Sequence, residues 1–201
     1  MPSELVLRWI FLLVFVGMFF ISGYFRRRAR QSGEAIRRDR EGRGALLARV
    51  VGAAVLYLPF VAYALQPTWM QWSSVHVPLW IRWLAGLVGF AMLPVLAWVM
   101  MSIGKNVSET YLTKESHKLI TAGPYRWVRH PLYTVAAIAL LSLSVAAANW
   151  LMLAVALAAL IAISLFVIPR EEAELVRKFG DEYREYQART GTLVPRVFRR
   201  A

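Results

Sequence analysis

The chain has 201 residues, of which 58% are hydrophobic, and its mean hydropathy is +0.47. Soluble domains are roughly 45–50% apolar, so this composition indicates an integral membrane protein. The formal net charge is +12, but the basic residues are confined to the connections between apolar runs, which argues against nucleic acid as a partner. The absence of cysteine excludes disulfides, a thiol nucleophile and cysteine-bound metal.

Five apolar runs are long enough, or nearly so, to cross about 30 Å of hydrocarbon, which takes about 20 helical residues. The first three are Leu5–Phe25, Ala45–Leu65 and Leu79–Met101. A further stretch, Leu132–Ile168, has 37 residues without a charge, and one straight helix of that length would extend about 55 Å. We therefore predict a tight hairpin near Asn149, with spans at Leu132–Ala148 and Trp150–Ile168.

The last 33 residues have a different pattern from these apolar runs. Apolar residues recur there at helical spacing, so they would form one face of a helix whose other face is charged. Val176, Phe179, Tyr183 and Tyr186 form the apolar face. Pro169 suits the first turn of a helix, so we predict one amphipathic helix from there to about Thr190-Gly191. It is expected to lie against the inner membrane surface or the protein's own cytoplasmic face.

These elements predict an all-α integral membrane protein with five transmembrane helices plus a C-terminal amphipathic cytoplasmic helix. No linker or internal repeat is visible, so one membrane domain over residues 1–201 is expected. Its first part, residues 1–103, holds three spans. Residues 104–195 form a core that contains the hairpin and the tail helix.

The positive charges predict the orientation of the chain in the membrane. Residues 26–44 carry eight arginines, residues 102–131 five basic residues and residues 169–201 eight, which together are 21 of the 24. The positive-inside rule makes this side cytoplasmic, with the N-terminus outside and the C-terminus inside. Three tryptophans then mark the outer interface: Trp69, Trp72 and Trp80. A bacterial inner membrane is the expected location, and the sequence makes no prediction of oligomeric state.

The segment His117–Tyr133 is polar, contains glycine and proline, and holds two of the three histidines. Gly123-Pro124 is a turn signal and Pro131 can begin the next helix. The residues between them therefore form an irregular loop at the mouth of the bundle. Non-helical backbone near lipid is tolerated where it lines a cavity or is buried in protein, so the segment predicts a pocket.

Each polar residue here also has an ordinary explanation when taken alone. Arg126, Arg129 and Lys118 suit interfacial anchors, and Glu171-Glu172 suits a helix start. Two histidines thirteen residues apart with no carboxylate cluster make a poor ligand set, so no metal site is predicted.

The combination is more specific than its parts. Three motifs follow one another: Gly104-Lys-Asn-Val-Ser108, His117-x-Leu-x-x-x-Gly-Pro-Tyr125 and Arg129-His-Pro-x-Tyr133. A fourth runs from Glu171-Glu172 through Phe-Gly180 to Tyr186 and ends near Leu193-x-Pro195. The set resembles the cofactor-binding signature of the isoprenylcysteine carboxyl methyltransferase family and its phospholipid methyltransferase relatives.

The resemblance implies a membrane-embedded enzyme that uses S-adenosylmethionine. The residues it implies for cofactor binding are His117, Lys118, Leu119, Ile120, Gly123, Pro124, Tyr125, His130, Pro131, Tyr133, Glu171 and Glu172. The residues it implies for catalysis are Arg129, His130, Arg170 and Glu171. Within that set, Arg129 and Arg170 are expected to place an anionic acceptor or the cofactor's carboxylate.

The acceptor is expected to be lipid-like or small and hydrophobic, with a carboxylate, an amine or a thiol as the reacting group. A carboxylate needs no base, whereas an amine must lose a proton, for which His130 is the nearest residue. Val135 stands where family members often have glycine, and its side chain is expected to narrow the entry for a prenyl-sized acceptor. Relatives also often carry an arginine about one helical turn before the paired glutamates, where Leu165–Ile168 is apolar here and Arg170 is the only nearby substitute.

Two other functions remain open from the sequence. An NADPH-dependent membrane reductase of the sterol-reductase type has a similar Arg-His-Pro-x-Tyr segment but usually more spans. A small transporter or membrane scaffold predicts polar residues facing one another at mid-bilayer, and the apolar runs carry charge only near their ends.

Overall fold

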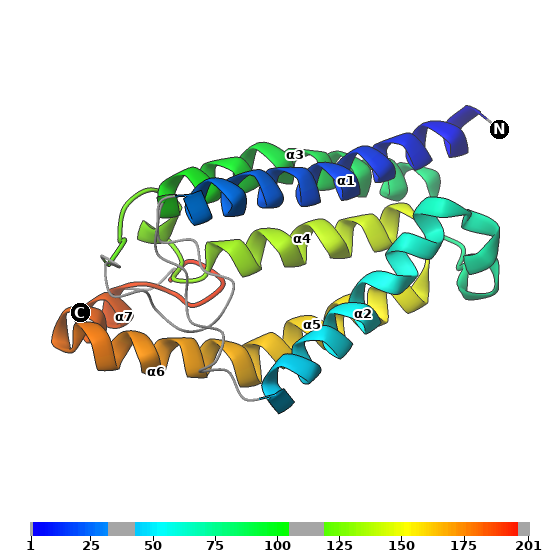
Figure 1. The fold of residues 1–201 in the computed structure, drawn as a ribbon. Helices are drawn as coiled ribbons and strands as arrows, with labels where there is room; N and C mark the ends of the chain where they lie inside the picture. Colours follow the sequence, from blue (N-terminus) through cyan, green and yellow to red (C-terminus); the bar gives the residue numbers. More distant parts are fainter. Residues whose placement is uncertain (1, 32–42, 105–118, 197–201) are drawn as a thin grey trace. The chain divides into compact units, whose positions relative to one another are not determined.

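The computed structural model describes residues 2–31, 43–104 and 119–196. Within these ranges the backbone is helical, and only two isolated bridges have β geometry. The α-helices are α1 (Pro2–Gln31), α2 (Arg43–Leu65), α3 (Leu79–Ile103), α4 (Pro131–Ala146), α5 (Trp150–Ala162), α6 (Ile168–Phe179) and α7 (Asp181–Arg189) (Figure 1). Three short elements join them: the 3₁₀ helices η2 (Pro67–Ser73) and η4 (Gly123–Arg126) and the π-helix η5 (Ile163–Val167). The all-α prediction is thus confirmed for the described residues.

Among the described residues, four helical stretches are long and apolar enough to cross a membrane. They are Ser3–Ala29, Leu46–Leu65, Leu79–Ile103 and Trp150–Phe179. The predicted hairpin is present, because α4 ends at Ala146 and α5 begins at Trp150, with Ala148 at a positive φ of 50° between them. The helix before this turn has 16 residues and is shorter than the other four stretches.

The chain divides into two compact units whose segments alternate along the sequence. Unit 1 comprises the described residues of Met1–Phe19, Arg37–Leu93 and Ala137–Ile161. Unit 2 comprises those of Phe20–Ile36, Pro94–Ala136 and Ala162–Ala201. The described residues of the three loop motifs, and the glutamate motif after them, belong to unit 2.

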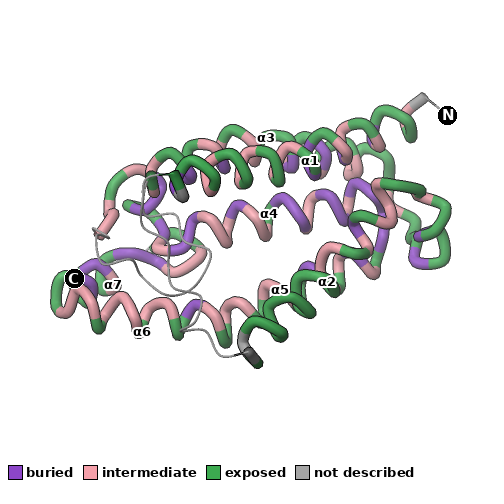
Figure 2. The backbone as a smooth tube through the Cα atoms, viewed as in Figure 1, coloured by how far each residue is buried: buried purple, intermediate pink, exposed green. Residues whose placement is uncertain are grey.

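Unit 1 has an aromatic core. Phe11 and Phe15 lie four residues apart on one face of α1, and both rings stack on Phe60 of α2, at centroid distances of 6.4 and 6.0 Å. Phe60 is buried, whereas most of α2 is exposed (Figure 2). Large apolar side chains exposed over a whole helix are typical of a surface that meets lipid.

A buried amide holds the hairpin of unit 1. The Nδ2 of Asn149 donates to the carbonyl oxygen of Met70 (3.1 Å) and to Oγ of Ser73 (2.8 Å). Its Oδ1 accepts from the backbone N–H of Met152 (3.1 Å), at the start of α5. The side chain thus joins the turn to η2 while it satisfies one of the free donors of the helix terminus.

Replacing Asn149 by alanine should destabilise the protein by about 2 kcal/mol, since buried partners on η2 and α5 lose their hydrogen bonds. Thermal unfolding of the purified protein in detergent measures the change. Gln71→Ala is the matched control, because that side chain is exposed on the same 3₁₀ helix. Equal stability of the two variants would contradict a structural role for the amide.

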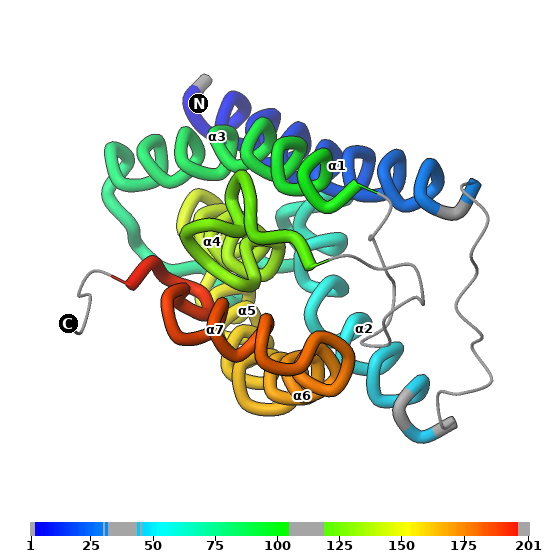
Figure 3. The backbone as a smooth tube through the Cα atoms, turned by 90° about the vertical axis from the view of Figure 1, so that its left-hand side faces the viewer, coloured from blue at the N-terminus to red at the C-terminus, as the bar shows by residue number. Residues whose placement is uncertain are grey.

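The prediction of one tail helix beginning at Pro169 is wrong in two respects. The helix that begins at Trp150 continues past this proline to Phe179, through the π turn of η5. In that turn the N–H of Ile168 donates to the carbonyl of Ile163, five residues back, directly before a residue that has no N–H. The helix then breaks at Gly180, whose φ of +57° and ψ of −127° suit glycine, and α7 starts anew (Figure 3).

Candidate active site

The irregular loop of unit 2 begins with a glycine that the backbone requires. Gly123 has a φ of +60°, and a Cβ there would lie 2.9 Å from Oγ of Ser102. The short helix η4 that follows buries Pro124 and Tyr125. The loop therefore turns tightly at the predicted Gly-Pro signal and places the Tyr125 ring inside the unit.

The two predicted motifs meet at Glu171. The Tyr133 hydroxyl donates to Oε1 of Glu171 (2.6 Å), and Nδ1 of His130 lies 3.5 Å from Oε2. The His130 and Tyr133 rings stack with their centroids 5.9 Å apart. His130 is buried and Glu171 is partly exposed, so the carboxylate forms the more accessible side of this group.

The neighbouring Glu172 has a different environment. Its Oε1 accepts from Nε of Arg129 (2.7 Å) and lies 3.2 Å from Nε2 of His130, while its Oε2 accepts from the Gln187 amide (2.8 Å). Glu172 thus joins the loop to α7. The two ring nitrogens of His130 face different carboxylates, one from each glutamate.

Residues 190–193, the C-terminal strap, run beside the loop in parallel. Backbone N–H groups of Arg129 and His130 donate to the carbonyls of Gly191 (2.8 Å) and Thr192 (3.1 Å). The Thr134 hydroxyl donates to the carbonyl of Leu193 (2.8 Å). The strap therefore fixes the backbone of the residues that carry the histidine.

The Arg129 side chain binds the same strap. Its Nη1 donates to the carbonyls of Gln187 (3.2 Å) and Thr190, and its Nη2 donates to the Thr192 hydroxyl (2.9 Å). With the bond to Glu172, this guanidinium has four acceptors within unit 2 and is only 10% exposed. Its donors are therefore largely committed to the protein itself.

Three tyrosines lie beneath this network. The Tyr186 hydroxyl donates to the carbonyl of Tyr125 (2.6 Å), which ties α7 to η4. Burial raises the pKa of Tyr186 to about 12, although nearby arginines oppose the shift. Burial also raises the pKa of Tyr125 and Tyr183 above the ordinary value, so all three hydroxyls stay protonated at physiological pH. The buried Tyr183 hydroxyl has no hydrogen-bond partner among the described residues.

The structure brings together many, but not all, of the residues expected from the sequence. Arg129, His130, Tyr133, Glu171 and Glu172 form one connected polar group. Tyr125 is tied through its backbone carbonyl to Tyr186 of α7. The remaining described residues of the set are Leu119 and Ile120, which are half-buried, and Gly123, Pro124 and Pro131, which shape the loop. His117 and Lys118 lie outside the described residues.

Arg170 is exposed and makes no hydrogen bond or ion pair with another described residue. Three polar residues of the network were missed by sequence analysis: Gln187, Thr190 and Thr192. All three lie between Tyr186 and Leu193-x-Pro195, in a part of the fourth motif where the residue types are not specified. Their position in that interval is their only signal in the sequence.

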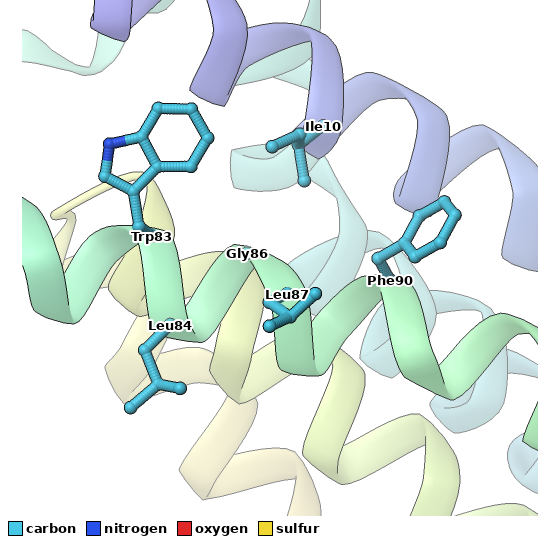
Figure 4. Close-up of a pocket in the computed structure, with 6 residues that line it drawn as sticks. All are labelled: Ile10, Trp83, Leu84, Gly86, Leu87 and Phe90. Carbon is cyan, nitrogen blue, oxygen red and sulfur yellow. The ribbon is translucent and has the colours of Figure 1, made fainter.

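Unit 1 contains an apolar pocket of about 520 Å³. Ile10 of α1 and four side chains of α3 line it (Figure 4). They are Trp83, Leu84, Leu87 and Phe90, with Gly86 between them. No titratable group contributes to this lining, so the pocket lacks the chemistry that the loop of unit 2 carries.

The model of the family described as "Isoprenylcysteine carboxyl methyltransferase (ICMT) family" matches residues 84–177. The match includes the loop with His130 and the paired glutamates. The resemblance to this family is confirmed. The match ends before α7 and the C-terminal strap, so it includes Glu172 but not the other three partners of Arg129, which are Gln187, Thr190 and Thr192.

Two curated proteins are similar to parts of the chain. Methanethiol S-methyltransferase 1 of Bradyrhizobium diazoefficiens is 40% identical over 72 residues, which are 35% of this chain and 24% of that protein. The nickel-cobalt-cadmium resistance protein NccN of Alcaligenes xylosoxydans xylosoxydans is 30% identical over 128 residues, 63% of this chain and 55% of that protein. The chain thus spans about a quarter and about half of the length of these relatives.

A solved structure is similar in fold. It is the eukaryotic intramembrane Ras methyltransferase ICMT (isoprenylcysteine carboxyl methyltransferase), determined without a monobody, with a TM-score of 0.55 and 21% sequence identity. The similarity covers 75% of this chain and 53% of that one. It supports a membrane fold like that of isoprenylcysteine carboxyl methyltransferase.

Proposed function

We propose that the protein is an S-adenosylmethionine-dependent methyltransferase of the membrane. The observation that carries the proposal is the meeting of two separate motifs at Glu171, where Tyr133 and His130 lie 2.6 and 3.5 Å from its carboxylate. The match to a methyltransferase family supports it. No comparison favours the reductase or the transporter.

The residues fit the chemistry of this cofactor, which supplies an activated methyl group on a sulfonium sulfur. Its amine and ribose hydroxyls need an acceptor, and Glu171 is a carboxylate that remains partly exposed while one oxygen accepts from Tyr133. Aromatic faces favour a sulfonium cation, and Tyr125, Tyr133 and His130 supply them. Leu119, Ile120 and the Gly123-Pro124 turn are proposed to line the same site, as are His117 and Lys118.

The paired glutamates are proposed to have different roles, one structural and one in cofactor binding. Glu172 already has three partners, so it holds the loop in place, and Glu171 meets the cofactor. Arg129 belongs with Glu172 as a positioning residue, because its guanidinium has four protein acceptors and little freedom to bind an acceptor's carboxylate. Arg170 is exposed and unpaired within the described residues, so it is the better of the two arginines for an anionic group.

A small hydrophobic or thiol acceptor is the proposed substrate class. Methanethiol S-methyltransferase 1 is similar over 72 residues, and the side chain of Val135, only 4% exposed, occupies the interior where the family often has glycine. Both ring nitrogens of His130 face carboxylates. The ring is thus engaged with the protein and poorly placed to take a proton from an acceptor, which favours an acceptor that reacts without a protein base over an amine.

We also propose that the chain crosses the bilayer five times, with the N-terminus outside and the C-terminus in the cytoplasm of a bacterial cell. The support is the 16-residue apolar helix α4 beside the four longer stretches, together with the distribution of basic residues. This topology puts the loop and the strap at the cytoplasmic boundary.

Titration calorimetry with S-adenosylmethionine and with S-adenosylhomocysteine tests the proposal on the detergent-solubilised protein. The unsubstituted protein should bind both, and Glu171→Gln should weaken binding at least about tenfold, since a charged hydrogen-bond acceptor is lost. His130→Ala should also weaken it. Glu174→Gln, on the same helix and paired with Arg177, is the matched control and should bind normally.

Two outcomes would count against the proposal. The first is a folded protein that binds neither compound. The second is a protein that binds NADPH and not the methyl donor, which would favour the reductase.

A further inference from the structure

A second cavity lies on unit 2, beside the C-terminal strap. It is a groove of about 950 Å³ whose walls come from several segments of the unit. Ser164 and Ile168 line it from η5 and the start of α6, Arg184 and Gln187 from α7, and the strap with the residues after it closes the remaining side. Of the site residues expected from the sequence, only Arg129 lines this groove.

The charges that line the groove have one sign. Among the described lining residues none is acidic, and two arginines besides Arg129 contribute, Arg184 and Arg196. Arg196 donates to the carbonyl of Ala188, which holds its guanidinium at the end of α7. Arg184 pairs with Asp181 at 2.8 Å, but these side chains are 65% and 87% exposed. Such an exposed pair contributes little and exchanges readily for another anion.

The other part of the lining is apolar. Ile168 is buried at the end of the long uncharged stretch that begins at Trp150, where a span would reach the headgroup region. Leu193, Val194 and Pro195 follow from the strap side, and Val194 is 73% exposed. The groove therefore combines an apolar wall at the membrane boundary with guanidinium groups on α7 and beyond it.

We infer that this groove binds a bilayer lipid with an anionic phosphate headgroup. The phosphate oxygens accept from Arg184 and Arg196, since a guanidinium fork matches a phosphate. The upper part of an acyl chain packs on Ile168, Leu193 and Val194. A zwitterionic lipid adds a cation that this lining does not match, and free phosphate has nothing to cover the apolar wall.

A lipid in this groove lies against the strap that hydrogen-bonds to the loop of His130. Because it binds only when the strap is in place, it stabilises the arrangement of Arg129 and the strap. The site is separate from Glu171 and Tyr133, so lipid binding does not depend on the proposed methyl transfer.

Native mass spectrometry and thermal unfolding in detergent test the site, with phosphatidylglycerol and phosphatidylcholine titrated separately. Phosphatidylglycerol should bind and raise the unfolding temperature more than phosphatidylcholine does. The double variant Arg184→Gln/Arg196→Gln should weaken phosphatidylglycerol binding about 25-fold, because each basic residue near an anionic lipid contributes a factor of about five. Val194→Asp should weaken it through the apolar wall.

Arg177→Gln/Lys178→Gln removes the same charge from α6 outside the groove and should leave binding unchanged. The inference is overturned if this control weakens binding as much as the groove variants do, or if the two lipids bind equally. It is also overturned if inorganic phosphate alone stabilises the protein as well as phosphatidylglycerol. S-adenosylhomocysteine binding, measured on the same samples, shows separately whether the proposed active site is intact.

Discussion

Replacing Arg129 by glutamine should destabilise unit 2 by about 3–5 kcal/mol and abolish binding of S-adenosylhomocysteine. The guanidinium pairs with Glu172 at 2.7 Å, and the two side chains are 10% and 16% exposed. Removing one partner of a largely buried pair leaves the other charge without compensation. Three further acceptors on α7 and the strap lose their donor in the same step.

Arg129→Lys distinguishes charge from geometry. Lysine restores a positive charge near Glu172. Its single ammonium group cannot reach all the acceptors that the three guanidinium nitrogens of Arg129 bind, so it should recover only part of the stability. Thermal unfolding and calorimetry on the same preparations measure both effects. Arg126→Gln is the control, because Arg126 is exposed and stacks on Trp127. A fully stable Arg129→Gln protein would show that the strap is held by its backbone alone.

A second large effect is expected from one methyl group in the strap. A Cβ at Gly191 would lie 1.9 Å from the carbonyl oxygen of Val194. Because the obstacle is backbone and not a flexible side chain, Gly191→Ala should displace the strap and cost about 3 kcal/mol. The carbonyl of Gly191 accepts from the N–H of Arg129, so cofactor affinity should fall together with stability.

Gly23→Ala is the matched control for this change. Gly23 lies inside α1, nothing stands within 4 Å of its Cβ position, and alanine is favoured in a helix by up to about 1 kcal/mol. The control should therefore be neutral or slightly more stable. Unfolding temperatures and cofactor titrations for both variants provide the comparison, and a Gly191→Ala protein that matched the control would contradict the close packing of the strap.

Sequence alone located the long elements well, because an apolar run in lipid has few alternatives. The third run was placed at Leu79–Met101 and α3 is Leu79–Ile103; the turn was placed at Asn149, and α5 begins at Trp150. Both predictions compared the length that an apolar run would have as a helix with the thickness of the bilayer. The tail was less accurate, since helical spacing of Val176, Phe179, Tyr183 and Tyr186 continues across Gly180 and gives no sign that the backbone breaks there.

The sequence indicated which polar side chains would cluster, and it did not indicate which partner each of them would bind. Motifs named His130, Tyr133, Glu171 and Glu172, and the structure joins them within 3.5 Å. Which glutamate binds the arginine depends on packing between α6 and the loop, which spacing does not encode. The strap was missed because most of its contacts with the loop are made by backbone carbonyls, which leave no signal in the choice of side chain.

The partners of Arg129 on the strap lie 61 and 63 residues further along the chain. At ribosomal rates of about 5–20 residues per second, they are made about 3–12 seconds after the arginine itself. Both membrane hairpin helices are already synthesised by then. The strap is therefore synthesised after the whole hairpin, and the loop that carries His130 gains these contacts only once both hairpin helices exist.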